Sequence, residues 1–214
     1  MTLTLPHGLA QPLMALSFAA PCFSMGFRLL SVWRDPMAVE QGRWVQLGIG
    51  VFVLEFILLH AGILLGAHAM TTSSGGLSLG GATLLLAFYA LFAGAIAMAF
   101  KSHMLFMSFL WMVVGRFVGV VIGISNDDQA LFLAHSLVAM VIYFALVVAS
   151  VVLPWPRLGI TDTVAATTRL PKASGLWVEQ PHRAVGPATV YFLLLGIVEV
   201  ALMTWIEPRS LTVR

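Results

Sequence analysis

The stretch VFVLEFILLHAGILLG, residues 51–66, decides what kind of protein this is. Fourteen of its sixteen residues are apolar or glycine, and the two exceptions are Glu55 and His60. Mostly apolar residues continue on both sides of the stretch, so the whole run is too long for a buried strand. A helix that crosses a bilayer needs about 20 predominantly apolar residues. We therefore predict a membrane-spanning helix that carries an acid and a histidine in its middle.

The composition extends this prediction to the whole chain. Of the 214 residues, 60% are hydrophobic and only 9% are charged, and the mean hydropathy is +0.97. Soluble domains contain about 45–50% apolar residues. The apolar runs lack the alternation of polar and apolar residues that β-barrel strands require. We expect an all-α, polytopic membrane protein that forms a single transmembrane domain over residues 1–214.

A hydropathy scan predicts a bundle of six transmembrane helices. An even number of spans places both termini on the same side of the membrane. The longest connection follows the fifth span and contains Trp155 and Trp177, which suit the headgroup layer. The predicted spans are 9–32, 45–68, 79–100, 104–124, 130–153 and 186–206, and the long loop is 154–185.

The basic residues predict the orientation. Eight of the 11 Lys and Arg residues flank the first, third and fifth loops, and the second and fourth loops contain none. The positive-inside rule then places the long loop in the cytoplasm and both termini outside, as in a bacterial-type inner membrane. This asymmetry accounts for the basic isoelectric point, so we expect no nucleic-acid partner. The eight residues are Arg28, Arg34, Arg43, Lys101, Arg157, Arg169, Lys172 and Arg183.

Ionisable residues inside the spans form the candidate site. At a rise of about 1.5 Å per residue, five of them on four helices fall at a similar depth: Glu55, His60, Arg116, His135 and Glu199. An isolated charge at mid-bilayer costs at least about 2.5–3.5 kcal/mol, so such groups face the bundle interior and find partners. We predict an ionic cluster in which Arg116 pairs with Glu55, with Glu199 or with both. The hydroxyls of tyrosines in the spans are available to the same layer.

Small residues predict close helix packing beside two of these charges. Gly62 and Gly66 share a helix face with Glu55. On the fourth span, three glycines at intervals of four residues accompany Arg116, a pattern that lets helix backbones approach closely. The glycines of that span are Gly115, Gly119 and Gly123.

The two histidines leave the chemistry open. His60 is about 140° around the helix from Glu55, so these two do not serve one small site, but His135 shares its depth. Two histidines on separate helices are the minimum for haem ligation, and with Glu199 they make a set suited to a transition metal. Buried histidines are also common as hydrogen-bonded structural residues or as sites of proton transfer.

Three functions therefore compete. The first is a subunit or accessory component of a membrane assembly, with other membrane subunits or further copies of the chain as partners beside the lipid bilayer. The second is a proton-coupled or small-solute transporter or channel, because protonatable groups at mid-membrane are typical of proton relays. The third is a haem- or metal-binding redox protein. No sequence motif identifies a reaction, and enzymatic activity is left open.

Overall fold

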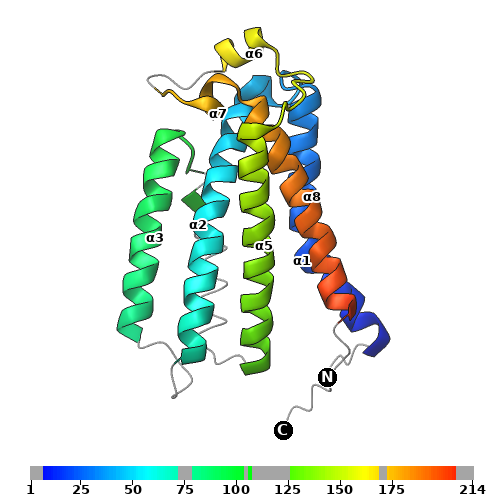
Figure 1. The fold of residues 1–214 in the computed structure, drawn as a ribbon, viewed down its shortest axis with the longest axis vertical. Coiled ribbons are helices and arrows are strands. Elements are labelled where there is room, and N and C mark those ends of the chain that lie inside the picture. Colours follow the sequence, from blue (N-terminus) through cyan, green and yellow to red (C-terminus); the bar gives the residue numbers. More distant parts are fainter. Residues whose placement is uncertain (1–6, 72–78, 104–105, 108–125, 169–172, 206–214) are drawn as a thin grey trace.

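The computed structural model describes residues 7–71, 79–103, 106–107, 126–168 and 173–205. Within these ranges all regular secondary structure is helical, which confirms the predicted class (Figure 1). The long helices are α1 (His7–Arg34), α2 (Arg43–Thr71), α3 (Leu79–Ala99), α5 (Asn126–Val152) and α8 (His182–Trp205). The short ones are the 3-10 turn η1 (Glu40–Gly42) and the helices α6 (Asp162–Thr167) and α7 (Leu176–Glu179).

Five of the six predicted spans correspond to these long helices, with ends that differ by a few residues. The remaining predicted span, 104–124, falls almost wholly outside the described residues. A count of six spans therefore stays a prediction.

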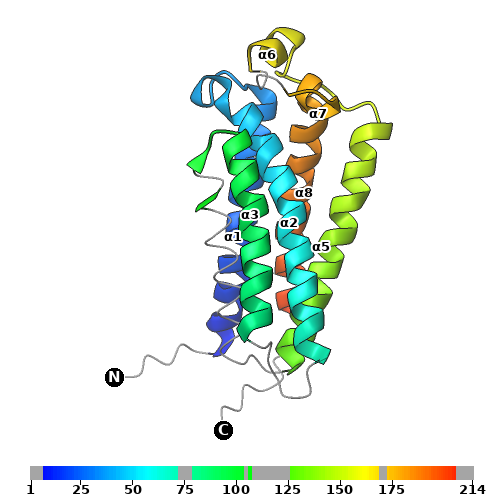
Figure 2. The same cartoon turned by 90° about the vertical axis from the view of Figure 1, so that its left-hand side faces the viewer.

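The long helices lie side by side: α1, α3 and α5 run toward one end of the bundle, and α2 and α8 run the opposite way (Figures 1 and 2). α1 packs along α8, and α2 contacts α5, α3 and α8. α1 begins and α8 ends at one end of the bundle, and α6 and α7 lie at the other end, which we call the connection end. α2 is thus the helix that brings the other elements together.

Within the described part of the chain, three helical segments are long and apolar enough to cross a membrane: Glu40–Leu64, Leu133–Val152 and His182–Ala201. The outer face of α5 shows why lipid is the expected surroundings. Leu137, Val141, Phe144 and Val148 recur at intervals of four, three and four residues, so they form one stripe, and all four are exposed. A contiguous apolar stripe of this length is a liability in water and suits contact with acyl chains.

α1 and α8 approach closely because glycines line their contact. A Cβ on Gly26 would lie 2.7 Å from Leu193 Cδ2, and a Cβ on Gly196 would lie 2.9 Å from the ring of Phe23. Neither position has room for a side chain. Small residues of this kind let helices pack in a bilayer, where dispersion contacts replace the hydrophobic effect as the driving force.

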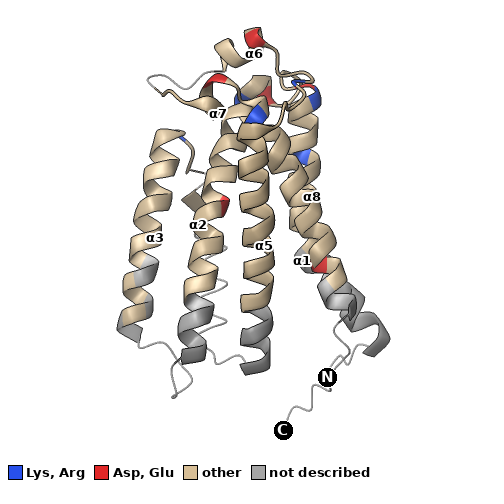
Figure 3. Ribbon diagram, in the orientation of Figure 1, with Lys and Arg blue, Asp and Glu red and all other residues tan. Residues whose placement is uncertain are grey.

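The connection end is charged and ordered. All described Lys and Arg residues lie at or toward this end, as Figure 3 shows. The segment after α5 is tied down by backbone contacts: Trp33 Nε1 donates to Pro156 O at 2.9 Å, and the amide of Gly159 donates to Trp33 O at 3.0 Å. The predicted surface loop 154–185 therefore contains two helices, α6 and α7, and the first residues of α8.

Candidate functional site

The first part of the candidate site is Glu55 in the interior of the bundle. Its side chain comes from α2 and is 6% exposed, and Tyr191 of α8 is completely buried. The hydroxyl of Tyr191 donates a hydrogen bond of 2.8 Å to Glu55 Oε1. The carboxyl group of Glu55 thus has a neutral hydroxyl donor beside it, contributed by a second helix.

Aromatic rings surround this contact. Phe52 lies one turn before Glu55, and its ring centroid is 4.9 Å from that of Tyr143 and 5.3 Å from that of Trp177. The hydroxyl of Tyr143 donates to Phe52 O at 3.0 Å. Tyrosines from α5 and α8 therefore hold α2 from two sides. We call Phe52, Tyr143 and Tyr191 the aromatic cluster, and Trp177 packs against it.

The second part of the site joins α5 to α8. His135 Nε2 lies 2.9 Å from Glu199 Oε1, and their side chains are 17% and 15% exposed. The ring N–H is not aligned for a hydrogen bond, so the contact is an ion pair by distance. The pair is attractive when the imidazole is protonated and Glu199 is ionised.

His60 lies on a different side of α2. Its Nδ1 is 2.9 Å from the hydroxyl of Tyr89, which comes from α3. Phe56 stacks on the imidazole with a centroid distance of 5.8 Å and an interplanar angle of 9°. His60 is exposed beside these partners, whereas Glu55 is buried. The two groups thus face different surroundings, as their separation of five residues implies.

The acids that we expected at one depth lie at two levels. Tyr191 contacts Glu55, and Glu199 follows Tyr191 by eight residues, or about 12 Å along α8. Tyr143 and His135 are separated by the same number of residues on α5. The upper level, nearer the connection end, contains Glu55, and the lower level contains the His135–Glu199 pair. The sequence-based depths missed this difference because they assumed upright helices with ends known only to a few residues.

Several predicted residues lie outside the described part of the chain. Arg116 and the glycines of its span, Gly115, Gly119 and Gly123, are among them, so the pairing of Arg116 with a glutamate stays a prediction. Gly62 is buried in α2, and Gly66 lies further along the same helix. The close-packing role of Gly62 and Gly66 also stays a prediction.

The residues proposed for metal binding do not converge. Among the described residues, no three His, Cys, Asp or Glu side chains come together in a way that could hold a metal ion. His60, His135 and Glu199 are all described, so the set of two histidines and one carboxylate is not assembled. The structure instead places His60 with Tyr89 and His135 with Glu199.

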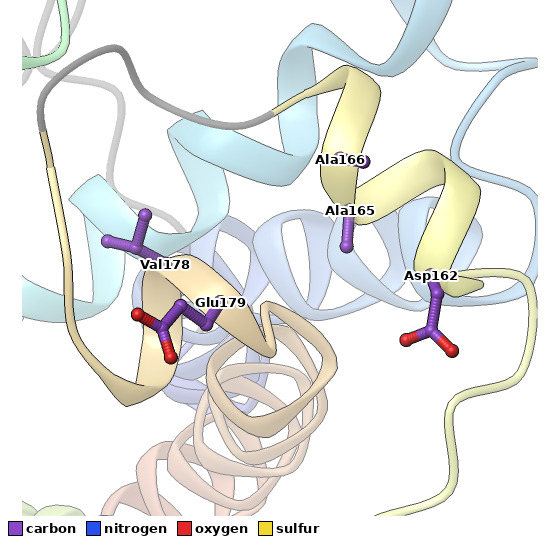
Figure 4. Close-up of a pocket in the computed structure, with 5 residues that line it drawn as sticks. All are labelled: Asp162, Ala165, Ala166, Val178 and Glu179. Carbon is purple, nitrogen blue, oxygen red and sulfur yellow. The ribbon is translucent and has the colours of Figure 1, made fainter.

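A shallow hollow of about 150 Å³ lies on the surface between α6 and α7. Asp162, Ala165 and Ala166 of α6 line one side of it, and Val178 and Glu179 of α7 line the other (Figure 4). Asp162 also forms an ion pair with Arg157. Its small size and its apolar floor leave this hollow without the convergent polar groups of a ligand site.

The amino-acid sequence alone did not reveal the role of Trp177. We expected this residue in the headgroup layer, but its ring is partly buried against the aromatic cluster. A tryptophan two residues after a glycine, in a proline-rich connection, gives no signal of burial by itself. Only the return of the connection onto the bundle places it there.

Comparisons with protein-family models, with curated proteins and with solved structures give no match.

Proposed function

We propose that this chain is a multi-pass membrane protein that binds and releases protons within the membrane, for the movement of protons or of a small solute coupled to them. The observation that carries the proposal is the contact between His135 and Glu199, 2.9 Å apart and largely buried between two helices that are apolar enough to span a bilayer. Both groups can exchange protons, and ionisable side chains within membrane spans are rare, are costly unless they are paired, and commonly mark functional sites.

The chemistry of this pair suits a change of charge. Imidazole changes charge near neutral pH, and a carboxylate that loses a cationic partner in a poorly hydrated site tends to take up a proton. Protonation of one group therefore alters the attraction between α5 and α8. This links proton binding to the packing of two helices.

Glu55 supplies a second proton site at the upper level. The two sites are separated by more than the length of a hydrogen bond, because Tyr191 and Glu199 are about 12 Å apart along α8. Direct proton transfer requires contact or one bridging water. We therefore treat Glu55–Tyr191 and His135–Glu199 as separate proton sites. The predicted partner of Glu55, Arg116, would add a fixed positive charge to the upper site.

The experiment that tests this proposal is a proton-flux assay. The purified chain is reconstituted into liposomes that contain a pH-sensitive dye, and a potassium diffusion potential drives proton entry. We expect a flux above that of protein-free liposomes, and we expect Glu199→Gln and His135→Gln to reduce it by at least about tenfold, the lower range of general acid–base effects.

The matched control is Glu40→Gln. Glu40 is an acid at the connection end that pairs with Arg28 at 2.8 Å and is about half exposed. Its replacement should leave the flux unchanged. A reconstituted protein that gives no flux, with and without an added pH gradient, would contradict proton conduction. Equal loss in Glu40→Gln and Glu199→Gln would show that neither effect is specific to the intramembrane pair.

A second candidate function is that of a subunit or accessory component of a membrane assembly. The observation that favours it is the ordered connection end, where α6 has no buried residue and is held out by an anchored segment. An exposed helix of this kind suits contact with a partner subunit. Purification in mild detergent, followed by identification of stoichiometric partners, tests this role. A partner that is lost on substitution of exposed α6 residues would support it.

We also propose that the connection end faces the cytoplasm. The described Lys and Arg residues lie at or toward this end, as the positive-inside rule requires. Labelling of a cysteine at Thr163, an exposed residue of α6, by an impermeant reagent tests the orientation in intact cells and in inverted vesicles.

A further inference from the structure

Trp177 returns from the connection between α5 and α8 to cover the aromatic cluster. It lies on α7, which contacts both α2 and α8. Its indole Nε1 donates to Ser150 Oγ at 3.1 Å, and its ring centroid is 5.3 Å from that of Phe52. The side chain thus contacts α5 and α2 together. This places an aromatic ring where three helices meet.

The position of Trp177 relative to Glu55 follows from the helix register. Phe52 precedes Glu55 by three residues on α2, so it lies about 4.5 Å nearer the connection end. Trp177 contacts Phe52 and comes from an element at that end. The indole therefore lies between Glu55 and the solvent at the connection end.

The backbone before α7 has the geometry of a hinge. Gly175 has φ 125° and ψ 165°, a region that is open essentially only to glycine. A Cβ at Gly175 would meet no atom within 4 Å, so the glycine is there for its backbone conformation and not for close packing. α7 has only four residues and ends at Gln180, whose backbone is again non-helical. A short helix between two such points can move as a unit.

The side chains of α7 are less buried than those of the segment that Trp33 anchors. Trp177 attaches α7 to the bundle through its hydrogen bond to Ser150 and its ring contact with Phe52, and none of the residues of α7 is fully buried. The nearby Trp33 differs in this respect, because its indole and its backbone oxygen both bond to the segment after α5. α7 is therefore the more weakly attached part of the connection end.

We infer that α7 is a hinged cap and that Trp177 is its gate residue, which controls the access of water from the connection end to the Glu55 site. The biological use of such a gate rests on the proposed proton function. The closed position of α7 does not depend on that function. The access of water to the Glu55 site can therefore be measured whether or not the protein conducts protons.

The test measures access with a buried cysteine. The native Cys22 is replaced by alanine, and Ala188, which is completely buried in the cluster with Phe52 and Tyr191, is replaced by cysteine. The rate of its reaction with an impermeant maleimide is measured in sealed vesicles of both orientations. A cysteine at the exposed Thr163 identifies the vesicles in which the connection end faces the reagent.

We expect Trp177→Ala to raise the labelling rate by at least about tenfold from the connection end only, since a cap that loses its main contacts opens more often. Trp177→Phe keeps a ring against Phe52 but loses the indole N–H, and Ser150→Ala removes the acceptor. Both should give smaller increases. These two milder variants test the gate if Trp177→Ala does not fold.

The matched control is Trp155→Ala. Trp155 lies at the same end, donates its Nε1 to Ala149 O at 2.8 Å, and packs against Trp33 in the neighbouring cluster. It should leave the labelling rate at Ala188→Cys nearly unchanged. An equal increase in the labelling rate in Trp177→Ala and Trp155→Ala would show general loosening of the connection end and would overturn the gate. An unchanged labelling rate in all the Trp177 and Ser150 variants would also overturn it. Absent proton flux together with a Trp177-specific increase would retain the gate and reject only the proton function.

Discussion

Replacing Tyr191 with phenylalanine isolates the hydrogen bond on which the Glu55 site depends. The change removes one hydroxyl and keeps the ring in the aromatic cluster. In the structure this hydroxyl lies 2.8 Å from Glu55 Oε1, and both residues are buried. We therefore expect Tyr191→Phe to destabilise the folded state through the lost hydrogen bond and not through lost packing.

The expected loss of stability in Tyr191→Phe depends on the charge of the acceptor and on the bilayer around the bond. Hydrogen bonds to charged groups contribute about 1.5–3 kcal/mol in soluble proteins. Within a bilayer, measured couplings average about 0.6 kcal/mol and reach about 1.7, because the unfolded chain also finds partners there. A buried bond to a carboxylate belongs at the upper end of the bilayer range. We expect about 1.5 kcal/mol, or about a tenfold change in the unfolding equilibrium.

The assay is a double-mutant cycle in mixed micelles, where SDS unfolds the protein and circular dichroism follows helix content. The four proteins are the natural chain, Tyr191→Phe, Glu55→Leu and the double variant. Any other contact of Glu55 is lost in both variants that carry leucine and cancels in the cycle. The coupling energy then reports the Tyr191–Glu55 contact.

Tyr143→Phe is the matched control. Its hydroxyl donates at 3.0 Å to the backbone oxygen of Phe52, a neutral acceptor inside helix α2. Its loss should cost about 0.6 kcal/mol, the bilayer average. A Tyr191–Glu55 coupling below about 0.5 kcal/mol, or an equal cost for the two tyrosines, would refute the reasoning that a charged acceptor makes this bond the stronger one.

Three further predictions concern contacts elsewhere in the bundle. His135→Gln and Glu199→Gln should couple by about 1 kcal/mol in the same unfolding assay, as expected for a partly screened ion pair, and independent effects would argue against the pair. Gly26→Ala should cost about 1–3 kcal/mol, because its Cβ would clash with α8, and a neutral effect would mean that α1 and α8 separate easily. Arg28→Gln breaks an exposed ion pair with Glu40 and should cost under about 1 kcal/mol, so a larger thermal shift would indicate a further role for this arginine.

The helices of this protein could be predicted because the sequence carries their signals locally. Long apolar runs separated by glycine, proline and charged residues mark α2, α3, α5 and α8. The structure confirms a helix at these four places. The candidate acids and histidines could be found in the same way, since any ionisable residue stands out against an apolar background. The clustering of basic residues on alternate loops likewise predicts one charged end.

The partners of these groups could not be predicted, because they depend on the rotation and relative depth of each helix. The pairing of Glu55 with Arg116 stays a prediction, because Arg116 lies outside the described residues, but the hydrogen bond from Tyr191 to Glu55 is a contact that the sequence did not identify. A rotation of 100° per residue decides which side chain faces a neighbour, so an uncertainty of a few residues in helix ends erases that information.

From the amino-acid sequence it follows that apolar helices enclose a small number of ionisable groups. Backbone polar groups are costly to expose to lipid, so apolar segments of this length form helices. The pairing of Glu199 with His135 and the packing of Trp177 on Phe52 became visible only in the folded chain. The physical reason is that these contacts join residues far apart in the chain, and only the packing of one helix surface against another fixes which of them meet.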